Sequence, residues 1–265
     1  MSAINEIEVR SLGELIEHAT PTVPDPASGR LRDYAVYRGA ADANWPLLSS
    51  LDRLGGVTPP GTKLHLENDI FRNFLRYAHA YLPPNLSNKW ELLIIAQHHG
   101  LPTRLLDWTY SPLVAAHFAT LEESAAARAV WKLDWTTMHD EFSIRKRALL
   151  VDELEEELDN RNSGFKDMMN GSGLGGSGFA ALIDPPAIDS RIVVQSSTFT
   201  FCTERGITLD KFLISKGLES ILTKFVLPVD RVSHLRDQLD LCSVDERRLF
   251  PDLDGVAAEM RRYYS

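Results

Sequence analysis

The sequence has few cysteines, no long apolar run and no apolar leader. Cys202 and Cys242 are its two cysteines. Two thiols are too few for a disulfide framework or a four-thiolate zinc site, so we expect a chain of the reducing cytoplasm. The longest strongly apolar stretch, residues 92–96, is far shorter than the roughly 18 residues of a membrane-spanning helix. Acidic residues among the first twenty predict that no signal peptide is present, and we expect no membrane association.

The chain also has fewer basic residues than acidic ones. The 265 residues include 28 Lys or Arg and 37 Asp or Glu, for a net charge of −9. A negative chain does not produce the broad positive field that drives non-specific nucleic-acid binding, so we expect no extended nucleic-acid-binding surface. Apolar residues at 44% and charged residues at 25% are typical of a soluble globular protein.

Helix and strand patterns alternate along the chain. Capping residues and apolar spacing predict helices after Ser11, at residues 64–80, 90–99, 141–160 and 208–216, after Ser111, and near the C-terminus with Ser243 as a cap. Short β-prone runs predict strands at residues 34–39, 101–109, 129–133, 191–194, 197–201 and 221–227. Six of the sixteen glycines fall in residues 164–178, which predicts a flexible loop. The alternation favours a single α+β domain.

Two sequence patterns resemble known binding sites, but the residues around each pattern argue against such a site. Residues 171–176 match the glycine pattern of a dinucleotide-binding loop, but no apolar strand precedes them and no long helix follows. His98 and His99 are adjacent, and adjacent side chains on a helix point about 100° apart, so they cannot readily share one metal ion. We expect no metal in this protein.

The most informative stretch is residues 97–109, where Gln97, His98, Arg104 and Asp107 stand among Leu, Pro and Trp. Buried Arg and Asp are costly unless they are paired, so this stretch either contains an ion-pair network or lines a pocket. Arg104 and Asp107 are three residues apart, and in a straight strand they would face opposite sides and have different partners.

A second polar feature is Arg38, which follows a β-prone run and precedes Gly39. An arginine at the end of a strand can hold two phosphate oxygens with its planar guanidinium group. A surface arginine is the alternative if the triplet around Arg38 is considered by itself.

Together these stretches resemble the FRG domain, a bacterial family named after a Phe/Tyr-Arg-Gly triplet. The resemblance lies in Tyr37-Arg38-Gly39 and in residues 97–109, 111–119, 191–199 and 249–255. On this basis residues 30–265 are identified as an FRG domain, and residues 1–29 as an N-terminal helix and linker.

The chain is also distantly similar to arginine-type ADP-ribosyltransferases. Residues 36–39 resemble their first strand, residues 107–109 stand in place of a Ser-Thr-Ser strand, and residues 191–194 with Phe199 resemble a third strand. This similarity implies a split, mixed or antiparallel sheet flanked by helices. Where those enzymes carry a catalytic glutamate, this chain has Asp189-Ser-Arg.

The resemblance implies that NAD or an ADP-ribose-like nucleotide binds between the Arg38 strand and the Arg191 strand. The implied activity is that of an ADP-ribosyltransferase or NAD glycohydrolase, acting as a bacterial toxin or anti-phage effector on a protein or nucleic-acid acceptor. The residues expected to bind the nucleotide are Tyr37, Arg38, Gly39, Gln97, Thr109, Arg191 and Gln195. The residues expected at the reaction centre are Arg38, His98, Arg104 and Asp107.

Within this interpretation Arg38 would hold the pyrophosphate or ribose, and Thr109 and Gln195 would bond the sugar or amide. Breaking the nicotinamide bond creates an oxocarbenium-like charge that a carboxylate stabilises, and Asp107 or Asp189 could supply it. Two alternatives stay open. The pocket could sense a nucleotide without cleaving it, or the chain could be a nuclease-type phosphodiester enzyme built on Asp107, His98 and the arginines.

Overall fold

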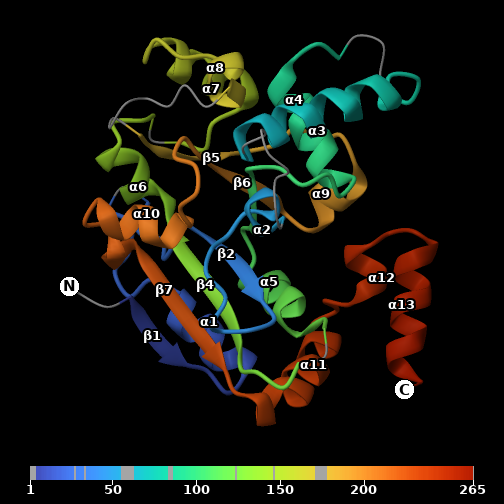
Figure 1. Cartoon of the computed structure of the whole chain (residues 1–265). Coiled ribbons are helices and arrows are strands. Elements are labelled where there is room, and N and C mark those ends of the chain that lie inside the picture. Colours follow the sequence, from blue (N-terminus) through green and yellow to red (C-terminus); the bar gives the residue numbers. More distant parts are fainter. Residues whose placement is uncertain are drawn as a thin grey trace.

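One seven-stranded sheet forms the centre of the part of the chain that the structure describes (Figure 1). This computed structural model describes residues 4–26, 28–32, 34–54, 63–82, 86–122, 124–145, 147–170 and 178–264. The strands are β1 (Asn5–Glu8), β2 (Ala35–Ala40), β3 (Leu106–Thr109), β4 (Arg128–Asp134), β5 (Ala180–Ile183), β6 (Ser197–Cys202) and β7 (Leu222–Leu227). Their order is β1-β7-β4-β2-β3-β6-β5, and all neighbours are antiparallel except β1 and β7. The predicted α+β fold is confirmed.

The sheet is split between β2 and β3. These two strands share a single residue pair, Tyr37 with Thr109, whereas β2 and β4 pair along six residues from Ala35 to Ala40. The sheet therefore consists of a four-stranded half, β1-β7-β4-β2, and a three-stranded half, β3-β6-β5. Figure 1 shows the two halves running in different directions.

Helices cover both halves. They are α1 (Leu12–Ala19), α2 (Ser50–Arg53), α3 (Lys63–Ala78), α4 (Lys89–His98), α5 (Pro112–Thr120), α6 (Trp135–Glu141), α7 (Val151–Asp159), α8 (Phe165–Asn170), α9 (Ser190–Val194), α10 (Leu209–Ser215), α11 (Val232–Leu241), α12 (Glu246–Leu249) and α13 (Leu253–Tyr263). One core group lies between the sheet and helices α3, α4, α7 and α8, and its sheet residues come from β5 and β6. Helices α1, α5 and α11 pack against β2, β4 and β7, and α6 and α10 contribute to a third core group.

Polar side chains begin several helices where the sequence predicts. Ser11 accepts the N–H of Glu14 at the start of α1, and Ser111 accepts that of Val114 at the start of α5. Asn88 accepts two N–H groups at the start of α4. Each cap satisfies donors that have no partner within the helix, so these short polar residues fix where the helices start.

Several predicted elements are wrong. Residues 191–194 form helix α9 instead of a strand, because Asp189 accepts the N–H of Arg191 at 2.7 Å and caps it. Val193, in this helix, is 60% exposed, so its β-branched side chain is not part of a buried sheet face. The strand predicted at residues 101–109 starts only at Leu106. Asp245 rather than Ser243 caps α12.

The predicted glycine loop at residues 164–178 is partly helical. Residues 165–170 form α8, because Met168 and Met169 pack into the core against α3 and α4. Residues 171–177 lie outside the described residues. The prediction for this segment is therefore wrong in its first part.

Two buried histidines are held in neutral form. His139 Nε2 accepts the N–H of Leu182 at 2.8 Å, so its Nδ1 carries the proton and donates to the Arg145 carbonyl at 2.9 Å. Burial lowers the pKa of His139. Burial, followed by the nearby positive charge of Arg236, lowers the pKa of His117 to about 4.

Candidate functional site

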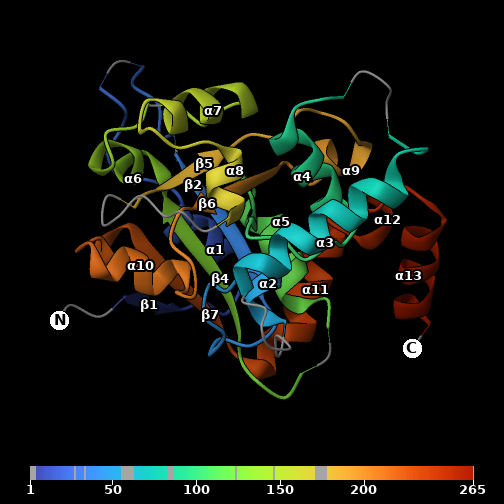
Figure 2. The ribbon, with the colours of Figure 1, turned by 45° about the horizontal axis from the view of Figure 1, so that its top comes forward.

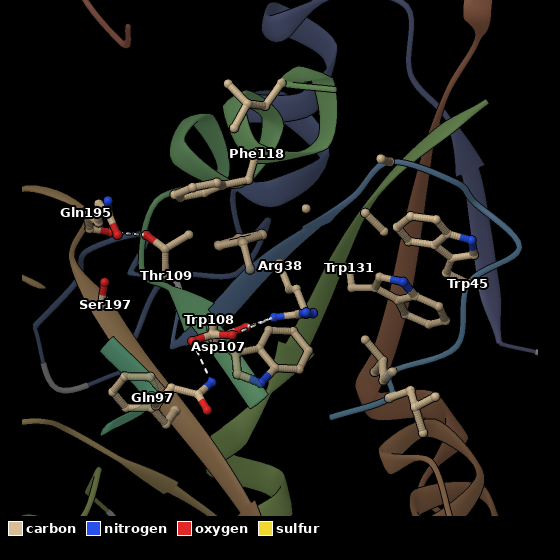
Figure 3. A pocket seen from close by; sticks show the side chains of 18 of the residues that line it. Arg38, Trp45, Gln97, Asp107, Trp108, Thr109, Phe118, Trp131, Gln195 and Ser197 are labelled. Carbon is tan, nitrogen blue, oxygen red and sulfur yellow. Dashed lines mark hydrogen bonds and ion pairs between the residues drawn. The ribbon is translucent and has the colours of Figure 1, made fainter. Parts of the chain in front are cut away.

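A cavity of about 530 Å³ opens beside the break in the sheet (Figure 3). Its walls come from β2, β3, the end of α4, α5, α9 and the loop after α12. Ten residues were expected to bind the nucleotide or to stand at the reaction centre, and nine of them line it: Tyr37, Arg38, Gly39, Gln97, His98, Asp107, Thr109, Arg191 and Gln195. The exception is Arg104.

Arg38 bridges the two halves of the sheet. From β2 its Nη1 donates to the backbone carbonyl of Asp107 on β3 at 2.7 Å, and it lies 3.5 Å from Asp107 Oδ2. The side chain is 18% exposed. Burial lowers the pKa of Arg38 and the Asp107 carboxylate opposes that shift, but an arginine stays charged at neutral pH. A fixed positive charge therefore stands at the cavity wall.

Asp107 presents its carboxylate to the cavity. Gln97 Nε2 donates to Oδ1 of Asp107 at 2.9 Å and to the Leu105 carbonyl at 3.3 Å. Gln97 is itself held, since its Oε1 accepts the Thr103 hydroxyl. The Asp107 side chain is nevertheless 59% exposed. Gln97 and Arg38 thus orient a carboxylate that stays open to a ligand.

Tyr37 and Gly39 line the cavity, but their main role is in packing β2 against α5. Tyr37 is 2% exposed and belongs to the core beneath α5. A Cβ at Gly39 would lie 2.2 Å from the Ala115 carbonyl oxygen and 2.5 Å from the Ala119 nitrogen. Glycine at this position therefore allows β2 to approach the backbone of α5.

Thr109 and Gln195 use their donors within the protein. The Thr109 hydroxyl donates to the Gln195 carbonyl at 2.7 Å, and Gln195 Nε2 donates to the Leu249 carbonyl at 2.9 Å (Figure 3 shows the first bond). These bonds tie β3 to the chain after α9, and that segment to α12. The Thr109 hydroxyl hydrogen and one of the two amide N–H groups of Gln195 are therefore already engaged, and both residues line the cavity.

Aromatic rings occupy two regions of the cavity wall, and none of them was expected in the site from the sequence. Trp131 pairs with Arg38 across β4 and β2, and Trp45 also lines the cavity. Phe118 meets Phe250 edge to face at 6.0 Å. In Figure 3 Phe118 lies on one side of Arg38, and Trp45 and Trp131 lie on another. Phe118 is part of the helix pattern noted above, whereas no local pattern marks the tryptophans.

Arg191 extends the second aromatic region. Its guanidinium carbon lies 4.7 Å from the centre of the Phe250 ring, a cation–π geometry that fixes the charge over the ring. Although the predicted strand is a helix, this residue still reaches the cavity, because α9 and the loop after α12 form one wall.

Arg104 belongs to a buried ion pair outside the cavity. Its Nε donates to both Glu67 oxygens at 2.9 and 3.0 Å, and its Nη2 donates to the Met168 carbonyl at 2.6 Å. Arg205 donates to the same carboxylate at 2.9 Å. We expected Arg104 at the reaction centre, but the structure places it in this ion pair, outside the cavity. The expectation that Arg104 and Asp107 have different partners is confirmed.

His98, the last residue of α4, also lines the cavity. Its Nε2 lies 3.5 Å from Asp189 Oδ1, and its side chain is 12% exposed. Burial lowers the pKa of His98, and the carboxylate of Asp189 opposes this shift. Asp189 caps α9 and is not among the residues that line the cavity, which leaves Asp107 as the carboxylate at the break in the sheet. Within the described residues no group of three or more His, Cys, Asp or Glu is placed to hold a metal ion.

These features define an α+β domain with an arginine-bearing cavity at a break in its sheet. Residues 33–128 match the family model of the FRG domain, so this part of the chain is an FRG domain, as its motifs predict. The match contains Arg38, Gln97 and Asp107, whereas Arg191 and Gln195 lie beyond it. No curated protein and no solved structure matches the chain. In the described part of the chain, no helix is both long and apolar enough to span a bilayer.

Proposed function

We propose that the cavity binds a dinucleotide of the NAD or ADP-ribose class. The observation that carries this proposal is the position of Arg38 between two aromatic regions. One is the half-exposed ring of Trp45 beside the buried Trp131, and the other is Phe118 with Phe250. NAD contains two heteroaromatic rings joined through a pyrophosphate, and ADP-ribose keeps one of them. Aromatic side chains stack on such rings, and a guanidinium group binds two phosphate oxygens at once.

Charge and size support the same ligand class. Arg38, Arg53 and Arg191 line the cavity with the carboxylates of Asp107 and Glu122, which gives the wall a positive balance in a chain of net charge −9. A pyrophosphate carries negative charge and is favoured there. The volume of about 530 Å³ falls within the range of about 300–1,000 Å³ typical of small-molecule sites.

The proposal extends to cleavage of the bond between ribose and nicotinamide. Departure of nicotinamide leaves an oxocarbenium-like ribose, and a fixed carboxylate stabilises that charge. Asp107 has the required exposure, and Gln97 and Arg38 hold it in place. In this function the chain is an NAD-consuming enzyme, an ADP-ribosyltransferase or glycohydrolase that serves as a toxin or anti-phage effector.

Calorimetric titration with NAD and with ADP-ribose tests binding. Loss of the charge-assisted bond in Arg38→Ala should weaken binding by about 2 kcal/mol, or roughly thirtyfold. Arg38→Lys should recover part of the affinity, because a point charge cannot reproduce the planar fork. Arg72→Ala is the matched control, since Arg72 is exposed on α3 and lies outside the cavity. Equal affinities for all four proteins, or no binding to wild type, would refute the proposal.

Release of nicotinamide from NAD tests cleavage. Asp107→Asn should abolish it while leaving stability within about 1 kcal/mol of wild type, since exposed ion pairs contribute little. A non-catalytic nucleotide sensor is the second candidate. The bonds from Gln97 and Arg38 to Asp107 favour it, because they already occupy part of the carboxylate. Binding of NAD without nicotinamide release would select this second function.

A further inference from the structure

A second, larger cavity adjoins the nucleotide cavity. It has a volume of about 1230 Å³ and is lined by α3, α4 and the segment before α9. Figure 2 shows α3, α4 and α9 on the same side of the molecule. Its wall is mainly apolar or aromatic, formed by Ile70, Phe74, Tyr77, Ala78, Tyr81, Leu82, Leu86, Ile95, Leu101 and Ile188. His98 lines both cavities. A molecule in the second cavity would therefore contact a residue that also faces the nucleotide.

The polar groups of the second cavity include two acids. Glu91 stands on α4, and Asp189 lies beside His98, with Oδ1 of Asp189 3.5 Å from Nε2 of His98. Asp189 is oriented by accepting the N–H of Arg191 at 2.7 Å. Carboxylates at the edge of an apolar cavity favour a molecule with a carbon body and a cationic end.

We propose that this cavity holds the acceptor of ADP-ribose transfer, a small molecule with an apolar body and a primary amine, and that His98 removes the proton of that amine. The inference rests on the proposed dinucleotide function of the first cavity. The apolar wall takes the body of the acceptor, since burial of carbon surface is favourable. Asp189, beside His98, attracts its amino end.

The cationic amine first loses one proton to His98, which passes it to solvent, so that the lone pair of the nitrogen becomes free. The amine nitrogen uses its lone pair to form a bond to C1′ of the nicotinamide-bearing ribose. The bond from C1′ to the nicotinamide nitrogen breaks, and its electron pair leaves with neutral nicotinamide. His98 takes one proton from the new ammonium and passes it to solvent. NAD and the ammonium form of the amine thus become ADP-ribosyl amine, nicotinamide and two protons, with no oxidant or reductant.

His98 suits this role by its surroundings. The charged and titratable groups around it are Asp189, His99 and Arg191, and burial keeps its pKa below the usual range. A neutral imidazole at physiological pH accepts a proton, which a charged one cannot do. Asp189 then stabilises the imidazolium that forms, as a paired carboxylate does.

The test uses n-butylamine, n-hexylamine and n-octylamine with NAD at mildly alkaline pH. Mass spectrometry quantifies ADP-ribosyl amine, and chromatography quantifies nicotinamide. Transfer should become more efficient along the series, roughly fourfold for each added methylene that the cavity buries. Ala78→Trp places a large ring in the cavity and should remove this dependence on chain length. Arg72→Trp, on the exposed side of α3, should retain it.

His98→Gln tests the proton transfer. It should lower amine transfer by at least tenfold, as loss of a general base does. After rates are divided by the fraction of unprotonated amine, wild type should still show a decline in acid as His98 becomes protonated, and His98→Gln should not. Nicotinamide release without any ADP-ribosyl amine, or transfer that is independent of chain length, would overturn the acceptor site and leave dinucleotide binding intact. Failure of wild type to bind NAD in calorimetry would instead overturn the proposed function and this inference with it.

Discussion

Gly39→Ala offers a direct test of the packing that places Arg38 at the cavity. The new Cβ would lie 2.2 Å from the Ala115 oxygen and 2.5 Å from the Ala119 nitrogen. Both atoms belong to the backbone of α5, so no side chain can rotate away. Close-packed interiors do not absorb such an overlap, and α5 would have to retreat from β2 by about 1 Å.

The expected loss of stability is about 3 kcal/mol, the upper part of the usual range for overpacking. For a domain of this size that loss lowers Tm by roughly 6–12 °C. Urea unfolding followed by far-ultraviolet circular dichroism gives the free energy, and a thermal scan gives Tm. The two measurements should agree in sign and in approximate size.

Gly13→Ala is the matched control. Gly13 lies in α1, and the nearest atom to an added Cβ is the Ser11 hydroxyl oxygen at 3.7 Å, an ordinary contact. Alanine is the better helix former, so this variant should gain about 0.5–1 kcal/mol. If Gly39→Ala is as stable as wild type within about 0.5 kcal/mol, the close approach of β2 to α5 is not what requires glycine.

Three further outcomes follow from buried groups. Glu67→Gln should destabilise the fold by about 3–5 kcal/mol in urea unfolding, because it removes the carboxylate that pairs with the buried Arg104 and with the partly buried Arg205; a loss below 1 kcal/mol would contradict a buried charge network. The free energy of unfolding should fall as pH drops below about 6.5, by up to about 1.4 kcal/mol per pH unit for each of His117 and His139, because the unfolded state then binds more protons; a flat profile down to about pH 5 would contradict their lowered pKa values. Burial raises the pKa of Cys202 to about 12, whereas Cys242 is exposed, so a thiol reagent at pH 8 should label one cysteine in the native protein and two after denaturation.

Much of the fold was predictable where the signal is local. Ser11, Asn88 and Ser111 cap helices in the structure as their sequence positions predict, because a cap depends on atoms within one turn. The strands at β2, β4, β6 and β7 were also expected from short β-prone runs. The strand predicted at residues 191–194 was wrong. The branched side chains of this run favour a strand, but the Asp189 cap and the exposed position of the segment favour a helix.

The candidate site was predictable to the extent that its residues are chemically unusual in sequence. Arg38, Gln97 and Asp107 stood out as polar groups in apolar runs, and they do meet at one cavity. Arg104 stood out for the same reason, but its partner Glu67 is 37 residues away in the sequence, so only the tertiary structure separates the two cases. Trp45 and Trp131 resemble ordinary core tryptophans in sequence, and their position beside Arg38 depends on strand order.

The single residue pair between β2 and β3 has a mechanical consequence. Neighbouring strands of a sheet are normally joined by many backbone hydrogen bonds, but β2 and β3 are joined by the Tyr37–Thr109 pair and by the side chain of Arg38. Backbone coupling between the two halves is therefore weakest here, and buried side chains from both halves that share one core carry the rest. A ligand that contacts both halves would add a further link across this junction. Slower amide exchange in β1 and β5, the two outermost strands, would then report that the cavity is filled.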